Sequence, residues 1–533
     1  MTKKFVSSRR IISIFLCFTV VALICFWRIY IIGNDEQRVQ GVTNGYTLSL
    51  GRLRGTIFDS NMQPITNSET KILAAVSPTP RAITAISSYL SGEELDAVLD
   101  VLRAGKPAVV EVKKEIDCEG IVILKVPQYV SSNTVCEHLI GYLNNENHGV
   151  SGIEKAYDQY LYSDEKIEII YPSDAFGNFL LGDQAEILYN ENILASGVSL
   201  TIDIELQKLT QNAMQDVKFG AAVVMEVGSG KIRAMVSAPR FDLSRVADYL
   251  EDENSPLLNR ALSAYNVGSV FKPCVAAALL ESGKSTGYVC NCSGRTSVSG
   301  HIFKCHKSNG HGQVNLASAL SGSCNVFFYK ISSLLGANSI YKMARKLNFG
   351  TALDMGKIST ASGSLDTLKN LENSQTSLAN LSIGQGKLLL SPVSILTLYE
   401  AIAGGGVYSM PSIVEGVVKN GIIERVKTSS PTRVMSEQSA KKLKEYLCDV
   451  LISGTGVSAK PSYVTAAGKT ATAETGWRKD GRLIQNSWFC GFFPVEDPKY
   501  VVAVLIEDEV KNGTSGAPIF KKIADNIALY EGL

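Results

Sequence analysis

The strongest hydrophobic signal lies near the N-terminus. Residues 11–32 are mostly apolar and carry a single charge, Arg28, and these 22 residues exceed the roughly 20 that a bilayer-spanning helix needs. Only basic charges precede the stretch, while Asp35 and Glu36 follow it, which by the positive-inside rule keeps the N-terminus in the cytoplasm. A cleaved signal peptide is the alternative, but the stretch is long for one and no small-residue cleavage site follows. We therefore expect a single-pass membrane anchor with the remaining chain outside the cytoplasm.

From the anchor to about residue 190 the hydrophobic patterns are short. Leu53–Ser68 predicts a strand, a turn and a returning segment. Ser91–Gly105 predicts a helix that Ser91 caps and Gly105 ends. Gly149–Leu161 carries apolar residues at helical spacing and predicts a second helix.

The pattern changes at Val198–Met214, where an apolar strand leads into an amphipathic helix. Gly220–Pro239 predicts a β-hairpin, and three more strands and a helix follow near the C-terminus. A long helical insert, from about residue 257 to 451, separates the two groups of strands. Two early strands that pair with three late ones give a five-stranded antiparallel sheet flanked by helices, the core of an α+β domain.

Length and charge limit the interpretation further. A chain of 533 residues is too long for one core, so we expect a cytoplasmic tail at 1–10, the anchor at 11–32 and domains at 33–190 and 191–533. The net charge is +1 and 19% of the residues are charged. These values give no electrostatic reason to expect a nucleic-acid partner.

Three short motifs carry candidate chemistry. Ser269 and Lys272 are three residues apart, so on a helix the lysine amine can reach the serine hydroxyl and act as its base if burial lowers its pKa. In the second motif one residue separates the hydroxyl of Ser323 from the amide of Asn325. The third motif, Lys469–Thr470–Ala471, lies at the start of a predicted strand. Each motif alone is also typical of an ordinary surface. All three in this order match the Ser-x-x-Lys, Ser-x-Asn and Lys-Thr-Gly set of acyl enzymes that recognise β-lactams.

The chain resembles the class B penicillin-binding proteins, the anchored transpeptidases of bacterial cell-wall synthesis. "LRGTIFDS" and "GVSGIEKAYDQYL" look like the family's pedestal signatures, and "LTIDIELQ", "NRAL", "GSVFKP", "SCNVFFY", "SIGQG" and "GKTATAE" look like its transpeptidase series. The resemblance implies an elongated pedestal of the dimerisation type at 33–190 and a transpeptidase domain at 191–533. It is closest to the division or sporulation type without C-terminal PASTA modules.

The resemblance also implies a role for each catalytic residue. Ser269 would attack the carbonyl before the terminal D-alanine of a stem peptide and form an acyl-enzyme, and Lys272 would accept its proton. Ser323 would relay a proton to the leaving amine, and Asn325 would hold the peptide amide and Lys272. β-Lactams would acylate the same serine. No cofactor is required, and a multispanning glycan polymerase is the expected partner.

The third motif would bind the substrate's terminal carboxylate through Lys469 and Thr470. The backbone N–H groups of Ser269 and Thr472 would form the oxyanion hole. Ala471 stands where the family usually has glycine, so we expect altered affinity for peptide or β-lactam rather than lost chemistry.

Two other readings of these motifs stay open. A β-lactamase or β-lactam sensor shares the catalytic set, although the sequence offers no base that would drive water onto the acyl-enzyme. A scaffold with an impaired active site is the alternative from another class, and Ala471 is its only support.

Cysteine and histidine gather in residues 290–312. Eleven cysteines occur in the chain, and the nine outside the anchor cannot all pair with one another, which favours a reducing exterior. Thiolates and imidazoles at short spacing suit tetrahedral zinc, although the spacings are not the usual ones. A surface loop with reduced thiols or a Cys292–Cys305 disulfide is the alternative. The candidate ligands of a structural zinc are Cys290, Cys292, Cys305 and His306.

Overall fold

The computed structural model describes residues 7–33, 45–172, 186–284, 287–427, 429–479 and 481–533. The chain forms two compact units that interleave along the sequence. The first unit comprises Met1–Leu53, Lys71–Val126 and Asp164–Asn190, and the second comprises Arg54–Thr70, Pro127–Ser163 and Glu191–Leu533. The chain thus passes between the units several times, the last time after Asn190. The linear division into 33–190 and 191–533 stays a prediction.

The predicted anchor forms a helix. Helix α1 spans Ser7–Gly33, and within it Ile12–Tyr30 is long and apolar enough to cross a membrane. Its large apolar side chains, from Ile12 to Tyr30, are exposed. The predicted orientation depends partly on basic residues before position 7 and on Asp35 and Glu36, which lie outside the described residues.

Beyond α1, the described residues of the first unit form two three-stranded sheets and two helices. One sheet has the order β1 (Gly45–Arg52), β6 (Lys166–Pro172), β7 (Glu186–Leu188), and the other has the order β4 (Ala108–Glu111), β3 (Glu69–Val76), β5 (Ile121–Gln128). The helices are α3 (Pro80–Ile86) and α4 (Glu93–Arg103). The predicted Ser91 cap is wrong, because Gly92 occupies the N-cap position of α4 and no side chain caps the helix.

The second unit begins with a four-stranded sheet, ordered β19 (Ile422–Arg425), β18 (Val414–Lys419), β8 (Gly197–Leu200), β2 (Thr56–Phe58). The returning segment predicted after β2 makes only a bridge between Phe58 and Pro64. The helix predicted at Gly149–Leu161 is divided into α6 (Gly152–Ala156) and α7 (Asp158–Leu161), since Tyr157 between them has non-helical dihedral angles.

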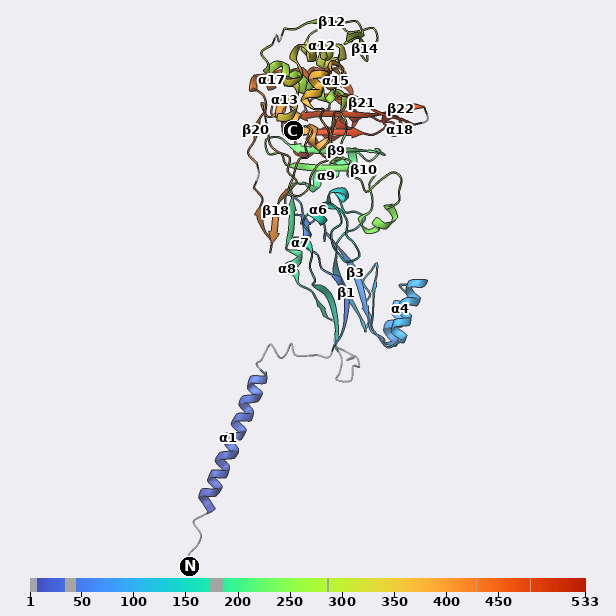
Figure 1. Ribbon diagram of the computed structural model, residues 1–533. Helices are drawn as coiled ribbons and strands as arrows, with labels where there is room; N and C mark the ends of the chain where they lie inside the picture. The colour runs from blue at the N-terminus through green and yellow to red at the C-terminus, as the bar shows by residue number, and fades with distance from the viewer. Residues whose placement is uncertain (1–6, 34–44, 173–185, 285–286, 428, 480) are drawn as a thin grey trace, which may run out of the picture. The chain divides into compact units, whose positions relative to one another are not determined.

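The predicted five-stranded antiparallel sheet is confirmed (Figure 1). Its order is β10 (Ile232–Ala238), β9 (Gly220–Glu226), β23 (Tyr500–Ile506), β22 (Arg482–Phe493), β21 (Ala467–Lys479). Thus the early hairpin pairs with the late strands through β9 and β23, as the sequence predicts. Strand β21, which carries Lys469 and Thr470, is an edge strand.

Helices cover this sheet. Helices α9 (Ile204–Ala213) and α19 (Gly516–Glu531) pack together on β10, β22 and β23, while α16 (Pro392–Ala403) and α17 (Glu437–Ile452) form a second pair on β9 and β21–β23. Every side chain of β23 is buried, and successive side chains of a strand point to opposite faces. The two helix pairs therefore lie on opposite faces of the sheet.

The insert between the strands is mainly helical, as predicted. The 3₁₀ helix η1 (Leu243–Tyr249) precedes it. Besides α16, α17, β18 and β19, the elements of the insert are β11 (Tyr265–Asn266), η2 (Gly268–Phe271), α10 (Lys272–Glu281), β12 (Cys290–Cys292), β13 (Arg295–Val298), β14 (His301–Lys304), β15 (Gly312–Val314), α11 (Leu316–Ser321), α12 (Asn325–Leu335), α13 (Ala337–Lys346), α14 (Leu368–Asn373), α15 (Gln375–Ser382), β16 (Leu389–Leu390), β17 (Val407–Tyr408) and β20 (Thr432–Arg433). The remaining short elements of the second unit are α5 (Glu137–Ile140), α8 (Glu191–Leu194), η3 (Val457–Ala459) and α18 (Glu509–Asn512).

One buried ion network joins "LRGTIFDS" to "GVSGIEKAYDQYL". Arg54 donates to Glu154 and to Asp158 at 2.7 Å each, and to the Asn147 carbonyl at 2.7 Å. The side chains of Arg54 and Glu154 are each 1% exposed. Burial raises the pKa of Glu154, and the Arg54 charge opposes that rise. The arginine thus keeps a buried carboxylate paired.

Arg54→Ala should therefore lower the free energy of unfolding by about 3–5 kcal/mol, because it leaves the Glu154 carboxylate buried without its partner. Urea denaturation of the full chain in detergent, followed by tryptophan fluorescence, measures this change. Arg245→Ala is the matched control, since the Arg245–Asp248 pair is exposed and its loss should change the free energy by less than about 1 kcal/mol. Equal losses in the two variants would contradict the prediction.

Candidate active site

Ser269 and Lys272 lie at the junction of two helical elements. Ser269 is in the 3₁₀ turn η2, and Lys272 is the first residue of α10, with Pro273 in its first turn. The pair therefore sits at a helix start rather than within the regular helix that the spacing predicts. Gly268 has a φ of +60°, and a Cβ there would lie 3.2 Å from the Cβ of Ala473 on β21. Glycine thus allows the serine turn to approach the edge of the sheet.

Lys272 connects the first two motifs. Its amine donates to the Ser323 carbonyl at 2.7 Å, to Ser323 Oγ at 3.1 Å and to Asn325 Oδ1 at 2.7 Å. The amine also lies 5.3 Å from the centre of the Phe328 ring. Lys272 is fully buried, and this burial lowers its pKa from 10.5 to about 7. The lysine is thus poised to accept a proton near neutral pH.

The third motif places a second buried amine nearby. Lys469 is fully buried, and its amine donates to Thr455 Oγ1 at 3.3 Å and to the Thr470 carbonyl at 3.1 Å. Burial, and secondarily the charge of Lys272, holds the pKa of Lys469 well below its usual value. The hydroxyls of Thr455 and Thr470 are 2.8 Å apart. Two amines and several hydroxyls therefore converge on one region.

A cavity of about 460 Å³ brings the motifs together. The predicted residues that line it are Ser269, Ser323, Asn325, Thr470 and Thr472. Lys272 and Lys469 reach it through their hydrogen bonds to Ser323, Asn325 and Thr470. The lining residues that sequence reasoning missed at this site are His306, Thr455, Ser458, Ser487, Trp488, Glu509, Ser515 and Ala517.

Thr455 is the most informative of the missed residues. It lies in "SGTG", an ordinary turn sequence, and contacts Lys469 and Thr470 only because its segment folds back beside β21. No spacing in the sequence marks it. His306 was predicted as a metal ligand, whereas in the structure it lines the cavity.

Ala471, the departure from the usual glycine, is 5% exposed. A Cβ on Gly268 would lie 3.4 Å from the Ala471 methyl group, so this methyl lies beneath the serine turn. The added carbon therefore fills space between β21 and η2, at the floor of the cavity.

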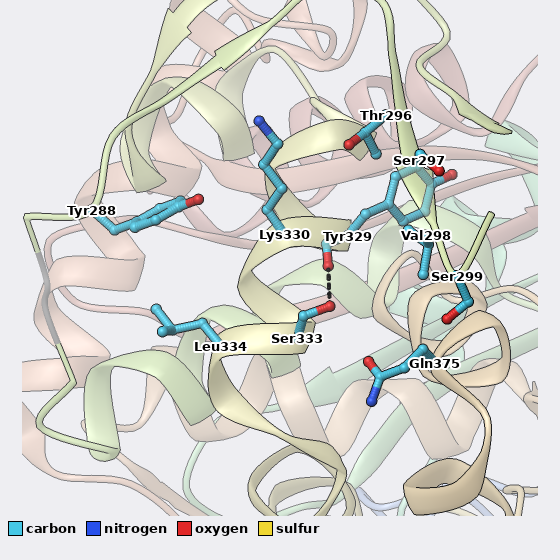
Figure 2. A pocket seen from close by; sticks show the side chains of 10 residues that line it. All are labelled: Tyr288, Thr296, Ser297, Val298, Ser299, Tyr329, Lys330, Ser333, Leu334 and Gln375. Atoms are coloured by element: carbon cyan, nitrogen blue, oxygen red, sulfur yellow. Dashed lines mark hydrogen bonds between the residues drawn. The ribbon is translucent and has the colours of Figure 1, made fainter. Parts of the chain in front are cut away.

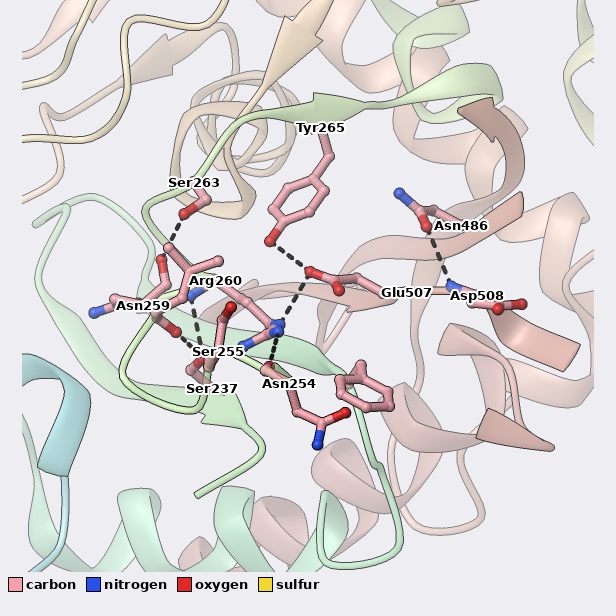
Figure 3. Close-up of polar contacts among 12 residues, drawn as sticks. Ser237, Asn254, Ser255, Asn259, Arg260, Ser263, Tyr265, Asn486, Glu507 and Asp508 are labelled. Atoms are coloured by element: carbon pink, nitrogen blue, oxygen red, sulfur yellow. Dashed lines mark hydrogen bonds and ion pairs between the residues drawn. The ribbon is translucent and has the colours of Figure 1, made fainter. Parts of the chain in front are cut away.

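Contacts outside the motifs hold the segment that precedes Ser269. Tyr265 donates to Glu507 Oε1 at 2.6 Å, and Arg260 donates to the same oxygen at 3.1 Å (Figure 3). Trp488 Nε1 donates to the Asn266 carbonyl at 2.9 Å. These bonds fix the approach to the serine against β22 and the end of β23.

The predicted zinc ligands are only partly brought together. Cys292 and Cys305 cluster with His311 and Cys324, and the four candidate ligand atoms lie within 4.8 Å of one another. Cys290 and His306 are not members of this cluster, so the predicted set changes at two positions. The sequence groups residues by short spacing, whereas the fold brings in Cys324 from the middle of the Ser323–Asn325 motif.

Comparisons with known proteins agree with this geometry. Residues 220–525 match the family model described as the penicillin binding protein transpeptidase domain. Stage V sporulation protein D of Bacillus subtilis is 27% identical over 435 residues, which cover 78% of this chain and 65% of that protein. A peptidoglycan D,D-transpeptidase of Mycolicibacterium smegmatis is 29% identical over 69% of this chain and 78% of its own length. The chain belongs to the class B penicillin-binding proteins.

Solved structures show the same fold for this penicillin-binding protein. The D,D-transpeptidase domain of an Eggerthella lenta protein aligns with a TM-score of 0.64 and 24% identity, over 90% of this chain and 99% of that one. Penicillin-binding protein 3 of Mycobacterium tuberculosis, in complex with aztreonam, aligns with a TM-score of 0.66 and 23% identity, over 92% of this chain and 98% of that one. The predicted α+β architecture is therefore confirmed.

The "SIGQG" motif supports the serine turn through the backbone. Gly268 N donates to the Gly384 carbonyl at 2.9 Å, and a Cβ on Gly384 would lie only 2.0 Å from the Gly268 carbonyl oxygen. Gly386, two residues on, also has a positive φ, but a Cβ there would meet nothing nearer than 3.4 Å. Alanine substitutions at the two glycines therefore distinguish the cost of backbone strain alone from the added cost of a steric clash.

Gly386→Ala should lower the free energy of unfolding by about 1–2 kcal/mol, through its left-handed backbone alone. Gly384→Ala should lower it by about 1–3 kcal/mol more, because the methyl group also collides with the serine turn. Urea denaturation of both full-length variants measures the difference. A loss in Gly384→Ala no greater than that in Gly386→Ala would contradict this reading of the turn.

Proposed function

We propose that the protein is a serine-type peptidoglycan D,D-transpeptidase that cross-links stem peptides and binds penicillin. One observation carries the proposal: the buried Lys272 amine is bonded to Ser323 and Asn325 at a cavity that Ser269 and Thr470 also line. A nucleophile, a base of lowered pKa and hydroxyl groups around one cavity are what acyl transfer requires. Relatives named as peptidoglycan D,D-transpeptidases support the same reaction.

The first half of the reaction releases D-alanine. Ser269 Oγ attacks the carbonyl carbon before the terminal D-alanine, and the neutral Lys272 amine accepts the hydroxyl proton. The backbone N–H groups of Ser269 and Thr472 stabilise the oxyanion, a contribution of about 3–4 kcal/mol per donor in comparable enzymes. The C–N bond then breaks, a proton passes from Lys272 through Ser323 to the leaving amine, and an ester remains on Ser269.

In the second half, an amine from a neighbouring stem peptide attacks this ester. The new amide is the cross-link, and Ser269 regains its proton. Asn325 binds the peptide amide of the donor, while Lys469 and Thr470 bind the donor's terminal carboxylate before it leaves. Because Lys469 is buried beside Lys272, a bound carboxylate offsets the unfavourable proximity of two amines.

We further propose that α1 anchors the protein in the cell membrane, with its N-terminus in the cytoplasm and its catalytic unit outside. Glycan strands then come from a partner, a multispanning polymerase in the same membrane. A structure of penicillin-binding protein 2 with MreC from Helicobacter pylori shows that one protein of this fold assembles with another protein.

Ser269→Ala should abolish acylation by benzylpenicillin. Intact-mass spectrometry of the full chain in detergent should show one stable penicillin adduct on the wild type and none on the variant. Ser282→Ala, at the C-terminal end of α10, is the control and should be labelled like the wild type.

The other outcomes of this experiment separate the alternatives. No adduct with consumed penicillin would indicate rapid deacylation and a β-lactamase. No adduct with intact penicillin would favour a scaffold, and Ala471→Gly would then be the next variant.

Acylation should also depend on pH through Lys272. Only the neutral amine accepts a proton, so the rate should rise with pH through the lysine pKa of about 7 and level off above it. At about pH 6 roughly a tenth of the amine is neutral, and acylation should be about tenfold slower than on the plateau. Stopped-flow measurement with a fluorescent penicillin gives this profile. A rate that does not change between about pH 5.5 and 8 would contradict Lys272 as the base.

A further inference from the structure

Three cysteines and a histidine form a cluster beside the Ser323–Asn325 motif. The sulfurs of Cys292, Cys305 and Cys324 and a ring nitrogen of His311 lie within 4.8 Å of one another. His311 Nδ1 is 3.6 Å from the sulfurs of both Cys292 and Cys305. Zinc–sulfur bonds of about 2.3 Å and a zinc–nitrogen bond of about 2.0 Å put tetrahedral ligand atoms about 3.5–3.8 Å apart. The two nitrogen–sulfur distances therefore match a tetrahedral zinc site, and the remaining pairs of ligand atoms lie within 4.8 Å.

The backbone brings these ligands together. His311 N donates to the Cys292 carbonyl at 3.0 Å, and Cys305 N donates to the Gly294 carbonyl at 2.9 Å. Gly294 and Gly310 have φ values of +88° and +77°, and a Cβ on Gly310 would lie 2.0 Å from the Cys292 carbonyl oxygen. Two tight turns that require glycine thus direct Cys292, Cys305 and His311 toward one point.

The His311 ring has a fixed orientation. Its Cδ2 and Nε2 atoms lie 3.3 and 3.5 Å from the position that a Cβ on Gly322 would occupy. This edge of the ring therefore packs against Gly322, two residues before Cys324, and Nδ1 faces the thiols. The absence of a side chain at Gly322 lets His311 approach the segment that carries Cys324.

Residues 292–311 make few apolar contacts besides that of Phe303, whose ring centre lies 5.0 Å from that of Tyr329 on α12. The residues of β13 and β14 are exposed or half-buried. Thr296–Ser299 line a cavity of about 550 Å³ together with Tyr288, Ser333 and Leu334 (Figure 2). In contrast, Cys292 is 1% exposed and Cys305 is 7% exposed. The thiols are thus the best-buried part of a loop that has little core of its own, the situation in which a metal commonly supplies folding energy.

We propose that Cys292, Cys305, His311 and Cys324 bind one structural zinc ion, which holds the 292–311 loop against the Ser323–Asn325 motif. Thiolate and imidazole ligands in tetrahedral geometry favour zinc over magnesium or calcium. With four protein ligands the site is closed, so the ion has no open position for substrate. Its role is to position residues of the active site.

Three connections link the cluster to the active site. Cys324 lies between Ser323 and Asn325, which both bond to Lys272. The Lys304 carbonyl, next to Cys305, accepts from Asn325 Nδ2 at 3.5 Å. His306 follows Cys305 directly and lines the active-site cavity. An ion at the cluster would therefore fix both the second motif and the loop that faces it.

Metal content tests the proposal directly. The full chain, purified in detergent without chelator, should contain about one zinc per molecule by mass spectrometry of the elements. After dialysis His311→Ala and Cys305→Ser should retain less than about a tenth of it. The matched controls are His306→Ala, in the same loop, and Cys290→Ser, two residues before it; neither residue belongs to the cluster, so both variants should retain the zinc. Wild type with less than about a tenth of an equivalent, or equal losses in the controls, overturns the proposal.

A second measurement applies to the wild type alone and does not depend on activity. Removing zinc with a chelator should speed tryptic cleavage after Arg295, Lys304 and Lys307 at least about tenfold, and added zinc should restore protection. The chelated protein should also react with a thiol reagent at Cys292, Cys305 and Cys324. Cleavage that the chelator leaves unchanged, or a disulfide between any two of these cysteines in the isolated protein, overturns the proposal.

Discussion

The Lys272 amine lies in the protein interior, where three hydrogen bonds to Ser323 and Asn325 hold it. Moving an ammonium ion out of water is unfavourable, so its pKa falls to about 7 and the amine becomes a base near neutral pH. The same burial opposes folding, because the unfolded chain binds the proton more tightly. The rest of the second unit must therefore be stable enough to keep this group in place.

The five-stranded sheet supplies that stability on one side of the site. Its central strands are buried on both faces, and β21 lies at its edge with Lys469 and Thr470. Gly268 and Gly384 let the serine turn approach this edge closely enough for backbone contacts. Arg260, Tyr265 and Glu507 anchor the segment that leads to the turn. Ser269 therefore sits on a rigid framework, as the proposed acyl transfer requires.

The opposite side of the site rests on a different kind of support. Residues 292–311 bury little apolar surface, yet they place His306 at the cavity and the Lys304 carbonyl beside Asn325. A metal ion bound by the three cysteines and His311 would hold this loop in place, as hydrophobic packing holds β21. The cavity thus joins residues held by the packing of the sheet to a loop for which the cysteine and histidine cluster is the proposed support.

Most local elements and the candidate site residues can be predicted from the sequence. Strands can be predicted from apolar runs such as Tyr500–Ile506 and from the turn in Gly220–Pro239, because strand formation depends largely on residues adjacent in the chain. The three motifs identify the candidate site side chains directly. The folded chain adds the break at Tyr157, the interleaving of two units, the contact of Thr455 with Lys469, and the grouping of Cys324 and His311 with Cys292 and Cys305. These features depend on segments distant in the chain meeting in space, and spacing along the sequence carries no information about that.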